Sequence, residues 1–405
     1  MTDPFSSNGR PPRLVRKDTH RDPDPATQVE RDNRVLRELD SDVVDDKYYA
    51  QIVVVIPAHN EAATIGMTIK CSFEQTYAPH RVIVMSDNST DNTVEVARAA
   101  GAEVHETVDN THKKGGAVNQ GLDIVLPTLD DRDYIVTMDA DGGVKTDLFE
   151  VAMEIFESRP GLGGLSGSVR CRQQDGWIET AQAIEYERGR RIMARKGGKI
   201  HVLSGAAAFF KVSVLRHVAE SRGTLLPGEK GDYMIKGSLV EDYELTLAVL
   251  ELGYSITSSK RAQLVTDLMP TLKELEAQRM RWYRGTLETL WLYGWRPYTR
   301  FTWASITFNL LASTLLPLAT AALTFGYLAF GSYPSILFFA LMPLFIIENY
   351  ICARRVDDKR AIWLALSFFP LWLYDNIQFT IYWRALWHAV TRKEAKWDGD
   401  QDDFA

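Results

Sequence analysis

The absence of charged residues near the C-terminus is the feature that most constrains this chain. From Phe301 to Ile347 there are 47 consecutive residues without Asp, Glu, Lys or Arg. A helix needs about 20 apolar residues to cross the hydrocarbon core of a bilayer, so this stretch is long enough for two crossings. The alternative is a set of buried core helices in a large soluble domain. We favour membrane helices, which excludes a wholly cytosolic protein.

Three segments of this region are candidates for membrane spans. We expect Trp303–Phe330 to cross first, the turn at 331–334 to reverse the chain, and Ser335–Ile351 to return. Ala361–Trp383 is a third candidate that either crosses or lies partly in the interface, because a proline and two polar residues interrupt it. The loop 353–360 carries four basic residues and is expected in the cytosol. The sequence therefore predicts a multi-pass protein of the cell membrane with a cytoplasmic catalytic domain.

The overall composition excludes two further classes of protein. The net charge is −7, so the chain lacks the basic field of a nucleic-acid-binding protein. Its three cysteines, Cys71, Cys171 and Cys352, are far apart and form no C-x-x-C pair. A disulfide framework or a structural zinc site is therefore not expected.

The middle of the chain alternates between predicted strands and predicted helices. Apolar, β-branched runs predict strands, and helical segments lie between them. In chain order the strands are expected at 51–57, 81–87, 102–106 and 134–142, and the helices at 61–76, 90–100 and 114–126. This alternation indicates βαβ units and an α/β fold with a mostly parallel sheet and helices on both faces. Further on we expect helices at 148–158, 178–195, 239–252 and 271–291, and a strand at 201–211.

These patterns divide the chain into five parts. We expect a disordered polar tail, a cytosolic α/β domain, interfacial helices with the QRMRW motif, a membrane region of about three spans and a second polar tail, at 1–48, 49–270, 271–300, 301–390 and 391–405.

Polar clusters follow three of the predicted strands. The sequences HNE, SDNSTD and DADG come directly after the strands that begin near residues 51, 81 and 134. In parallel sheets ligands bind beyond the carboxyl ends of the strands. We therefore expect these clusters to form one site.

Each polar motif also has a structural explanation. Asp139 and Asp141 at a strand end suit a hard cation that also binds diphosphate, but acidic pairs are common in solvated turns. The positive charge of Lys114, in KKGGAVN at a helix start, would favour binding of a phosphate. The alternative is a plain helix cap with a solvated lysine. Asp87 either contacts a base or closes an Asx turn, and Asn60 is either a ligand or a helix N-cap.

Two later motifs are similarly ambiguous. Glu241 and Asp242 precede an apolar helical run, where Asp242 is either a general base or, like Glu241, a helix-start acid that favours the dipole. QRMRW at 278–282 combines a glutamine, two arginines and a tryptophan immediately before the apolar region. It is either a binding motif or an interfacial helix with snorkelling arginines.

Taken together and in order, IPAHNE, SDNSTD, KKGGAVN, DADG, SGAAAFFK, VED and QRMRW resemble the processive family 2 glycosyltransferases. That group includes synthases of cellulose, chitin, hyaluronan and poly-N-acetylglucosamine. The resemblance covers about residues 50–290, and the stretch 181–196 looks most like the N-acetylglucosamine-polymer branch. Two features depart from the family: SDN replaces the usual D-D-G, and the N-terminal membrane helices common in polymer synthases are missing.

The resemblance implies a GT-A-type domain and a role for each motif. The general base would be Asp242, and the metal ligands would be Asp139 and Asp141, with Asp141 the closer. The remaining residues would contact the nucleotide, the diphosphate or the acceptor sugar: Pro57, His59, Asn60, Glu61, Asp87, Lys114, Asp139, Ser204, Gly205, Glu241, Gln278, Arg279, Arg281 and Trp282.

The function that we expect is a membrane-bound, inverting glycosyl transfer that uses Mg²⁺ or Mn²⁺. The first choice of donor is UDP-N-acetylglucosamine, with UDP-glucose and UDP-glucuronate as alternatives, and the acceptor is a growing β-linked polysaccharide or oligosaccharide. The alternatives are a single addition to a polyprenyl phosphate or to another lipid or protein, and a non-catalytic scaffold. The expected partners are the UDP-sugar, the carbohydrate acceptor and the bilayer, with no nucleic acid; a homo-oligomer or an export partner stays open.

Overall fold

The computed structural model describes residues 49–172, 176–331, 336–356 and 358–391. Its elements are β1 (Ile52–Ala58), α2 (Ile65–Phe73), β2 (Arg81–Ser86), α3 (Thr93–Ala99), β3 (Glu103–Glu106), α4 (Lys113–Val125), η1 (Leu126–Thr128), β4 (Tyr134–Met138), β5 (Gly143–Val144), α5 (Leu148–Glu157), β6 (Leu162–Cys171), α6 (Trp177–Arg195), β7 (Ala207–Lys211), α7 (Val212–Ser221), α8 (Glu241–Glu251), β8 (Ser255–Thr266), α9 (Leu272–Tyr293), α10 (Arg300–Phe330), α11 (Ile336–Ala353), α12 (Lys359–Leu366) and α13 (Phe369–Val390). The tails predicted at 1–48 and 391–405 lie outside the described residues, apart from Thr391.

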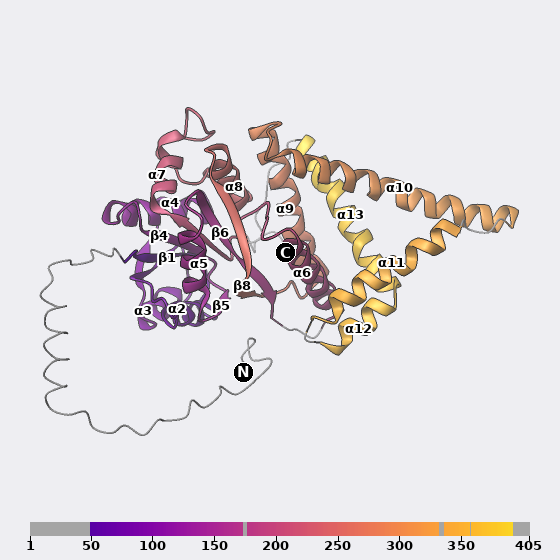
Figure 1. Cartoon of the computed structure of the whole chain (residues 1–405), viewed down its shortest axis with the longest axis horizontal. Coiled ribbons are helices and arrows are strands. Elements are labelled where there is room, and N and C mark those ends of the chain that lie inside the picture. The colour runs from indigo at the N-terminus through magenta and orange to yellow at the C-terminus, as the bar shows by residue number, and fades with distance from the viewer. Residues whose placement is uncertain (1–48, 173–175, 332–335, 357, 392–405) are drawn as a thin grey trace, which may run out of the picture. The chain divides into compact units, whose positions relative to one another are not determined.

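Eight of the described strands form one sheet in the order β3-β2-β1-β4-β7-β6-β8-β5. The first four pair in parallel, as the alternation of strands and helices predicted, and β6 and β8 are also parallel. β7 is antiparallel to both β4 and β6 and therefore joins the two parallel parts. All seven residues of β1 are buried, which suits a run of β-branched residues in the centre of a covered sheet. Figure 1 shows this sheet with its helices.

The sequence analysis missed two long strands. β6 has the sequence LGGLSGSVRC and β8 has SITSSKRAQLVT, and neither shows the continuous apolar run of a buried strand. The expected strand at 201–211 was too long, because regular pairing begins only at Ala207. The segment before it forms a loop, and that loop belongs to the candidate site described below.

The described residues of the charge-poor C-terminal region are helical, as expected. None of the helices in the described part of the chain combines the length and the apolar character that a membrane crossing requires. α10 is 31 residues long and carries no charged side chain after Arg300. The proposed third span is divided into α12 and α13 at Phe368, whose φ is 55°. The three expected spans are therefore not supported by the described residues and stay a prediction.

Helix α9 lies close to the chain that precedes α8. α9 begins at a capping box in which the N–H of Glu274 donates to Oγ1 of Thr271 at 3.2 Å. Farther along, a Cβ added to Gly285 would lie 2.9 Å from side-chain atoms of Leu239 and Val240. Glycine at this position therefore lets the helix approach residues 239–240, immediately before α8.

The packing of α4 on the sheet gives a first prediction. A Cβ at Gly121 would lie 2.9 Å from side-chain atoms of Val55 and of Met85. We expect Gly121→Ala to lower the free energy of unfolding by about 1–3 kcal/mol, the usual cost of overpacking.

The matched control is Gly189→Ala in α6, because no atom lies within 4 Å of that added Cβ. Alanine favours a helix over glycine by about 1 kcal/mol, so this change should leave the protein as stable or make it more stable. Denaturant titrations of both variants test the prediction. Equal effects of the same sign would contradict close packing at Gly121.

Candidate active site

The polar clusters after β1 and β2 meet at one edge of the sheet. Ala58 and Ser86 are register partners in these parallel strands. The N–H of Asp87 donates to the carbonyl of Ala58 at 2.8 Å, and Nδ1 of His59 lies 2.6 Å from the carbonyl oxygen of Asp87. The structure therefore brings together the two clusters that the sequence placed at strand ends.

Asn60 and Glu61 shape the turn after β1. Asn60 has φ of 55°, and its side-chain carbonyl accepts the N–H of Thr90 at 2.8 Å. Glu61 accepts the hydroxyl of Thr64 at 2.6 Å, and the N-cap of α2 is Thr64. Asn60 is therefore not the helix N-cap that was the alternative explanation.

The Asp87 carboxylate is held by neighbouring side chains. Its Oδ1 accepts the hydroxyl of Thr107 at 2.8 Å and the amide of Asn88 at 3.0 Å. These bonds fix the carboxylate beside the turn after β1. The predicted contact of Asp87 with the nucleobase of the donor stays a prediction.

Lys114 connects three elements of the site. Its Nζ lies 2.6 Å from Oδ1 of Asp139, after β4, and 2.9 Å from Oε1 of Glu241, at the start of α8. Burial alone would lower the pKa of Lys114, but Asp139, Glu241 and Asp242 together raise it above the ordinary lysine value. The lysine therefore stays charged and partly neutralises an acidic cluster.

Asp242 is oriented by two backbone N–H groups. Its Oδ1 accepts the N–H of Tyr243 at 2.7 Å, and its Oδ2 accepts the N–H of Gly205 at 3.0 Å. Burial and the nearby Glu241 raise the pKa of Asp242 to about 6, whereas Lys114 and the Gly205 N–H act in the opposite direction. Such a pKa suits a group that accepts a proton near neutral pH.

Gly205 leaves room for the charged groups around it. A Cβ at this position would lie 2.8 Å from Nζ of Lys114 and 3.5 Å from Oδ2 of Asp242. The preceding residue, Ser204, donates its N–H to Oγ of Ser166 on β6 at 3.0 Å. Strand β6, which the sequence did not predict, therefore positions the loop.

A narrow pocket is lined by five of the predicted residues, Pro57, Lys114, Gly205, Glu241 and Asp242.

The pair of aspartates after β4 has the character of an incomplete cation site. Burial raises the pKa of Asp141 to about 6, and the charges of Asp139 and Glu61 add to this effect. A divalent cation would relieve this repulsion between carboxylates. No group of three or more His, Cys, Asp or Glu side chains is placed to hold a metal ion within the described ranges. The donor set therefore fits Mg²⁺ or Mn²⁺ only where substrate phosphates supply further oxygens.

The QRMRW residues lie on α9, in two different environments. Arg281 donates to the carbonyl oxygen of Leu239 at 3.4 Å, three residues before Asp242. Arg279 is buried, its Nη2 lies 3.0 Å from Oε2 of Glu185 on α6, and its guanidinium lies 4.7 Å from the ring centroid of Trp282. Arg279 therefore joins helices, and its predicted contact with substrate stays a prediction, as do those of Gln278 and Trp282.

Glu185 is a residue of this region that sequence analysis did not assign. Its Oε2 also accepts the hydroxyl of Tyr374 on α13 at 2.6 Å. The carboxylate therefore links α6, α9 and α13. No local signal identifies this link, because Glu185 and Tyr374 are 189 residues apart in the chain.

Comparisons with known proteins agree with this geometry. The family model described as "Glycosyltransferase like family 2" matches residues 50–285. The poly-beta-1,6-N-acetyl-D-glucosamine synthase of Staphylococcus epidermidis is 23% identical over 372 residues, which cover 85% of this chain and 84% of that protein. The synthase of the same name from Staphylococcus aureus strain COL is 26% identical over 245 residues, 59% of this chain and 55% of that protein.

Solved structures support the fold. A mannosyltransferase from Pyrobaculum calidifontis, solved with GDP-mannose and Mn²⁺, superposes with a TM-score of 0.56 at 19% identity and covers 91% of this chain and 96% of its own. The expected GT-A-type domain with a mostly parallel sheet is thereby confirmed.

The carboxylate pair after β4 gives a second prediction. Asp141→Asn removes one of the two charges that would bind a cation. We expect the Mn²⁺-dependent affinity for UDP to fall about tenfold or more, equivalent to about 1.4 kcal/mol, when UDP is titrated by calorimetry. Asp130→Asn is the control, because Asp130 precedes β4 at its opposite end and pairs with Arg132. If both variants bind UDP and Mn²⁺ like the wild type, Asp141 is not part of the site.

Proposed function

We propose, because the chain belongs to glycosyltransferase-like family 2, that it transfers a sugar from a UDP-sugar to a carbohydrate acceptor with inversion at the anomeric carbon. The observation that carries the proposal is the position of Asp242. Its carboxylate is fixed by two backbone N–H groups. Asp242 and Lys114 line the same pocket, and Lys114 also pairs with Asp139, which follows strand β4. In this proposal Asp242, as the base, and Lys114, which would bind the diphosphate, therefore line the same pocket.

UDP-N-acetylglucosamine is the donor that we favour. Support comes from the two staphylococcal synthases named for poly-beta-1,6-N-acetyl-D-glucosamine, one of which aligns along 84% of its length. UDP-glucose and UDP-glucuronate are the alternatives. The acceptor in this proposal is a growing β-linked polysaccharide or oligosaccharide. A single addition to a polyprenyl phosphate or other acceptor is the competing outcome of a product analysis.

Asp139 and Asp141 are the residues that would hold a divalent cation together with the diphosphate of the donor. Bound Mg²⁺ or Mn²⁺ supplies Lewis-acid stabilisation of the leaving nucleotide. Lys114 adds a fixed positive charge at the same place. Because Lys114 is already held by carboxylates, little reorganisation is needed as negative charge develops.

Asp242 in this proposal accepts the proton of the attacking acceptor hydroxyl. The hydroxyl oxygen forms a bond to the anomeric carbon, the bond from that carbon to the diphosphate oxygen breaks, and UDP leaves with the bonding electrons. The two N–H groups that bind the carboxylate of Asp242 hold it in one orientation. A positioned base typically contributes about 10²–10⁴-fold to rate.

Removing this base is the direct test of the proposal. We expect Asp242→Asn to reduce sugar transfer by about 10²–10⁴-fold, while binding of UDP-N-acetylglucosamine in the presence of Mn²⁺ persists. The wild-type rate should fall as the pH drops through about 6, because a protonated Asp242 cannot accept a proton. The measurements are radiolabelled transfer and calorimetric binding on the same purified proteins.

The alternative role of Asp242 gives a different result. An acid that only favours the dipole at a helix start contributes about 0.3–1 kcal/mol of stability. Activity per folded molecule would then be unchanged in Asp242→Asn. Full activity in the variant would contradict the proposed base.

We also propose that the C-terminal helices bind the lipid bilayer of the cell membrane, with the catalytic domain in the cytoplasm. Apolar residues on α10 recur at helical spacing and are exposed: Phe308 by 70%, Leu311 by 55%, Leu315 by 60% and Leu318 by 61%. Intervals of three and four residues place them on one helix face. An apolar face of this kind is typical of a surface that contacts lipid or a partner.

Charge added to this face should release the protein from membranes. We expect the double variant Phe308→Glu, Leu315→Glu to move from the membrane pellet into the high-salt supernatant, measured by sedimentation and immunoblotting. The control is Val108→Glu, Leu225→Glu, since these residues of the catalytic domain are exposed by 72% and 71%. Sedimentation of the α10 variant like the wild type would contradict the proposal.

A further inference from the structure

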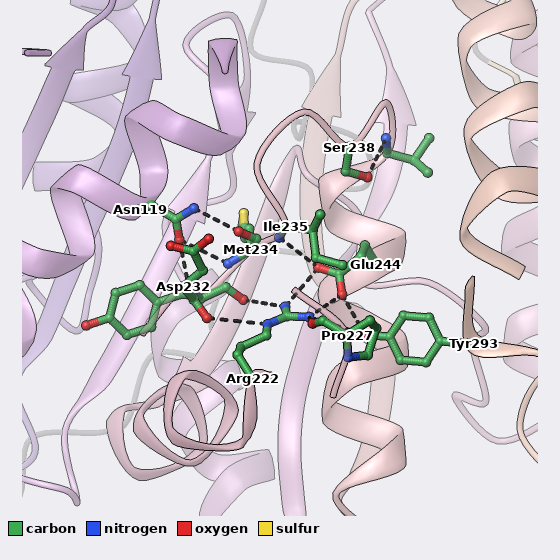
Figure 2. Close-up of polar contacts among 11 residues, drawn as sticks. Asn119, Arg222, Pro227, Asp232, Met234, Ile235, Ser238, Glu244 and Tyr293 are labelled. Carbon is green, nitrogen blue, oxygen red and sulfur yellow. Dashed lines mark hydrogen bonds and ion pairs between the residues drawn. The ribbon is translucent and has the colours of Figure 1, made fainter. Parts of the chain in front are cut away.

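The segment between α7 and α8 crosses the fold beside the active-site pocket. Within it, residues 232–235 have six backbone polar groups bonded to three buried side chains. Those side chains are Asn119, Arg222 and Glu244, which come from three different parts of the chain (Figure 2). We call residues 232–235 the crosspiece.

Asn119 binds the crosspiece from α4. Its side-chain oxygen accepts the N–H groups of Tyr233 and Met234 at 2.9 and 3.0 Å, and its Nδ2 donates to the carbonyl of Met234 at 2.8 Å. Asn119 is 4% exposed. These three hydrogen bonds hold the backbone of Tyr233 and Met234 in one position, because loss of any of them leaves a buried polar group unpaired.

Arg222 and Glu244 bind the crosspiece from the end of α7 and from α8. The Arg222 guanidinium makes two bonds to the Glu244 carboxylate, at 2.6 and 2.9 Å, and both side chains are essentially inaccessible to solvent. Arg222 also donates to the carbonyls of Asp232 and Tyr233 at 3.3 and 2.8 Å. Glu244 accepts the N–H of Ile235 at 3.1 Å and the hydroxyl of Tyr293 at 2.5 Å.

The crosspiece connects the two helices that carry the charged groups of the pocket. Asn119 is five residues after Lys114 on α4, and Glu244 is two residues after Asp242 on α8. Met234 is buried and lines the same pocket as Lys114 and Asp242. The crosspiece is therefore both a wall of the pocket and a connection between the helix of the lysine and the helix of the base.

We propose that Asn119, Arg222 and Glu244 are positioning residues for sugar transfer, which hold the crosspiece so that Lys114 and Asp242 face one donor at a fixed separation. This inference rests on the proposed function, since it assigns a role in the same reaction. None of the three lines the pocket, so they act through the backbone of 232–235. A displacement of about 1 Å in such a site costs up to about 10²-fold in rate.

The test uses Asn119→Ala in the full chain. We expect kcat for UDP-N-acetylglucosamine to fall at least tenfold, while the Kd for UDP in the presence of Mn²⁺ changes less than threefold. In the proposed function most of the UDP contacts come from the strand ends near Asp87 and Asp141, whereas the rate also depends on where Asp242 lies relative to the bound donor. A second variant, Asn119→Asp, keeps an acceptor for both N–H groups but places a buried carboxylate oxygen against the carbonyl oxygen of Met234, so its kcat should fall as well while UDP binding is retained.

The matched control is Gln182→Ala in α6. Gln182 is a buried amide whose Nε2 donates to the carbonyl of Met269 at 2.8 Å and whose Oε1 accepts the N–H of Met269 at 3.2 Å. It therefore makes the same kind of bonds to one methionine as Asn119 makes to Met234. We expect Gln182→Ala to lower the melting temperature as Asn119→Ala does but to retain kcat per folded molecule.

The outcomes separate this inference from the proposed function. Wild-type kcat in Asn119→Ala, or an equal loss of kcat in Gln182→Ala, overturns the inference alone. If Asn119→Ala does not fold, Asn119→Asp decides: a lowered kcat with retained UDP binding supports the inference, and wild-type kcat overturns it. A wild-type protein that transfers no sugar overturns both.

Discussion

The ion pairs of Lys114 are the contacts on which the active site depends. A single ammonium group pairs with Asp139 after β4 and with Glu241 at the start of α8, and the nearby Asp242 adds a third negative charge. Without the lysine these carboxylates would repel one another in a partly buried place. With it, the ends of a central strand and of two helices are fixed around one pocket, and the remaining negative charge still favours a cation.

The surrounding fold places these groups by contacts that are distant in sequence. The loop with Gly205 is bound to β6 through Ser204 and Ser166, and Gly205 in turn orients Asp242. Glycine at this position leaves Lys114 in its place, because an added Cβ would lie 2.8 Å from its Nζ. The orientation of Asp242 therefore depends on a strand and a loop that contribute no acid or base to the pocket.

Sequence patterns predicted the first half of the fold better than the second. The strands β1, β2 and β4 are continuous apolar runs, and so their ends and the residues His59, Asp87 and Asp139 could be located in advance. β6 contains three glycines and two serines, and β8 contains polar residues throughout, so neither shows the apolar run of a buried strand. The buried pair of Arg222 and Glu244 likewise gives no local signal, because it joins a helix end to another helix across 22 residues. The lack of charge from residue 301 onward predicted the helices α10 and α11 correctly, whereas the expected membrane spans stay a prediction.

Product analysis tests the central claim most directly. Purified full-length protein would be incubated with Mn²⁺, an oligosaccharide acceptor and, separately, UDP-N-acetylglucosamine, UDP-glucose, UDP-glucuronate and GDP-mannose, and the products identified by mass spectrometry and linkage analysis. The account predicts β-linked N-acetylglucosamine on the acceptor and release of UDP. Transfer from GDP-mannose alone, or transfer with an α linkage from any donor, would contradict it.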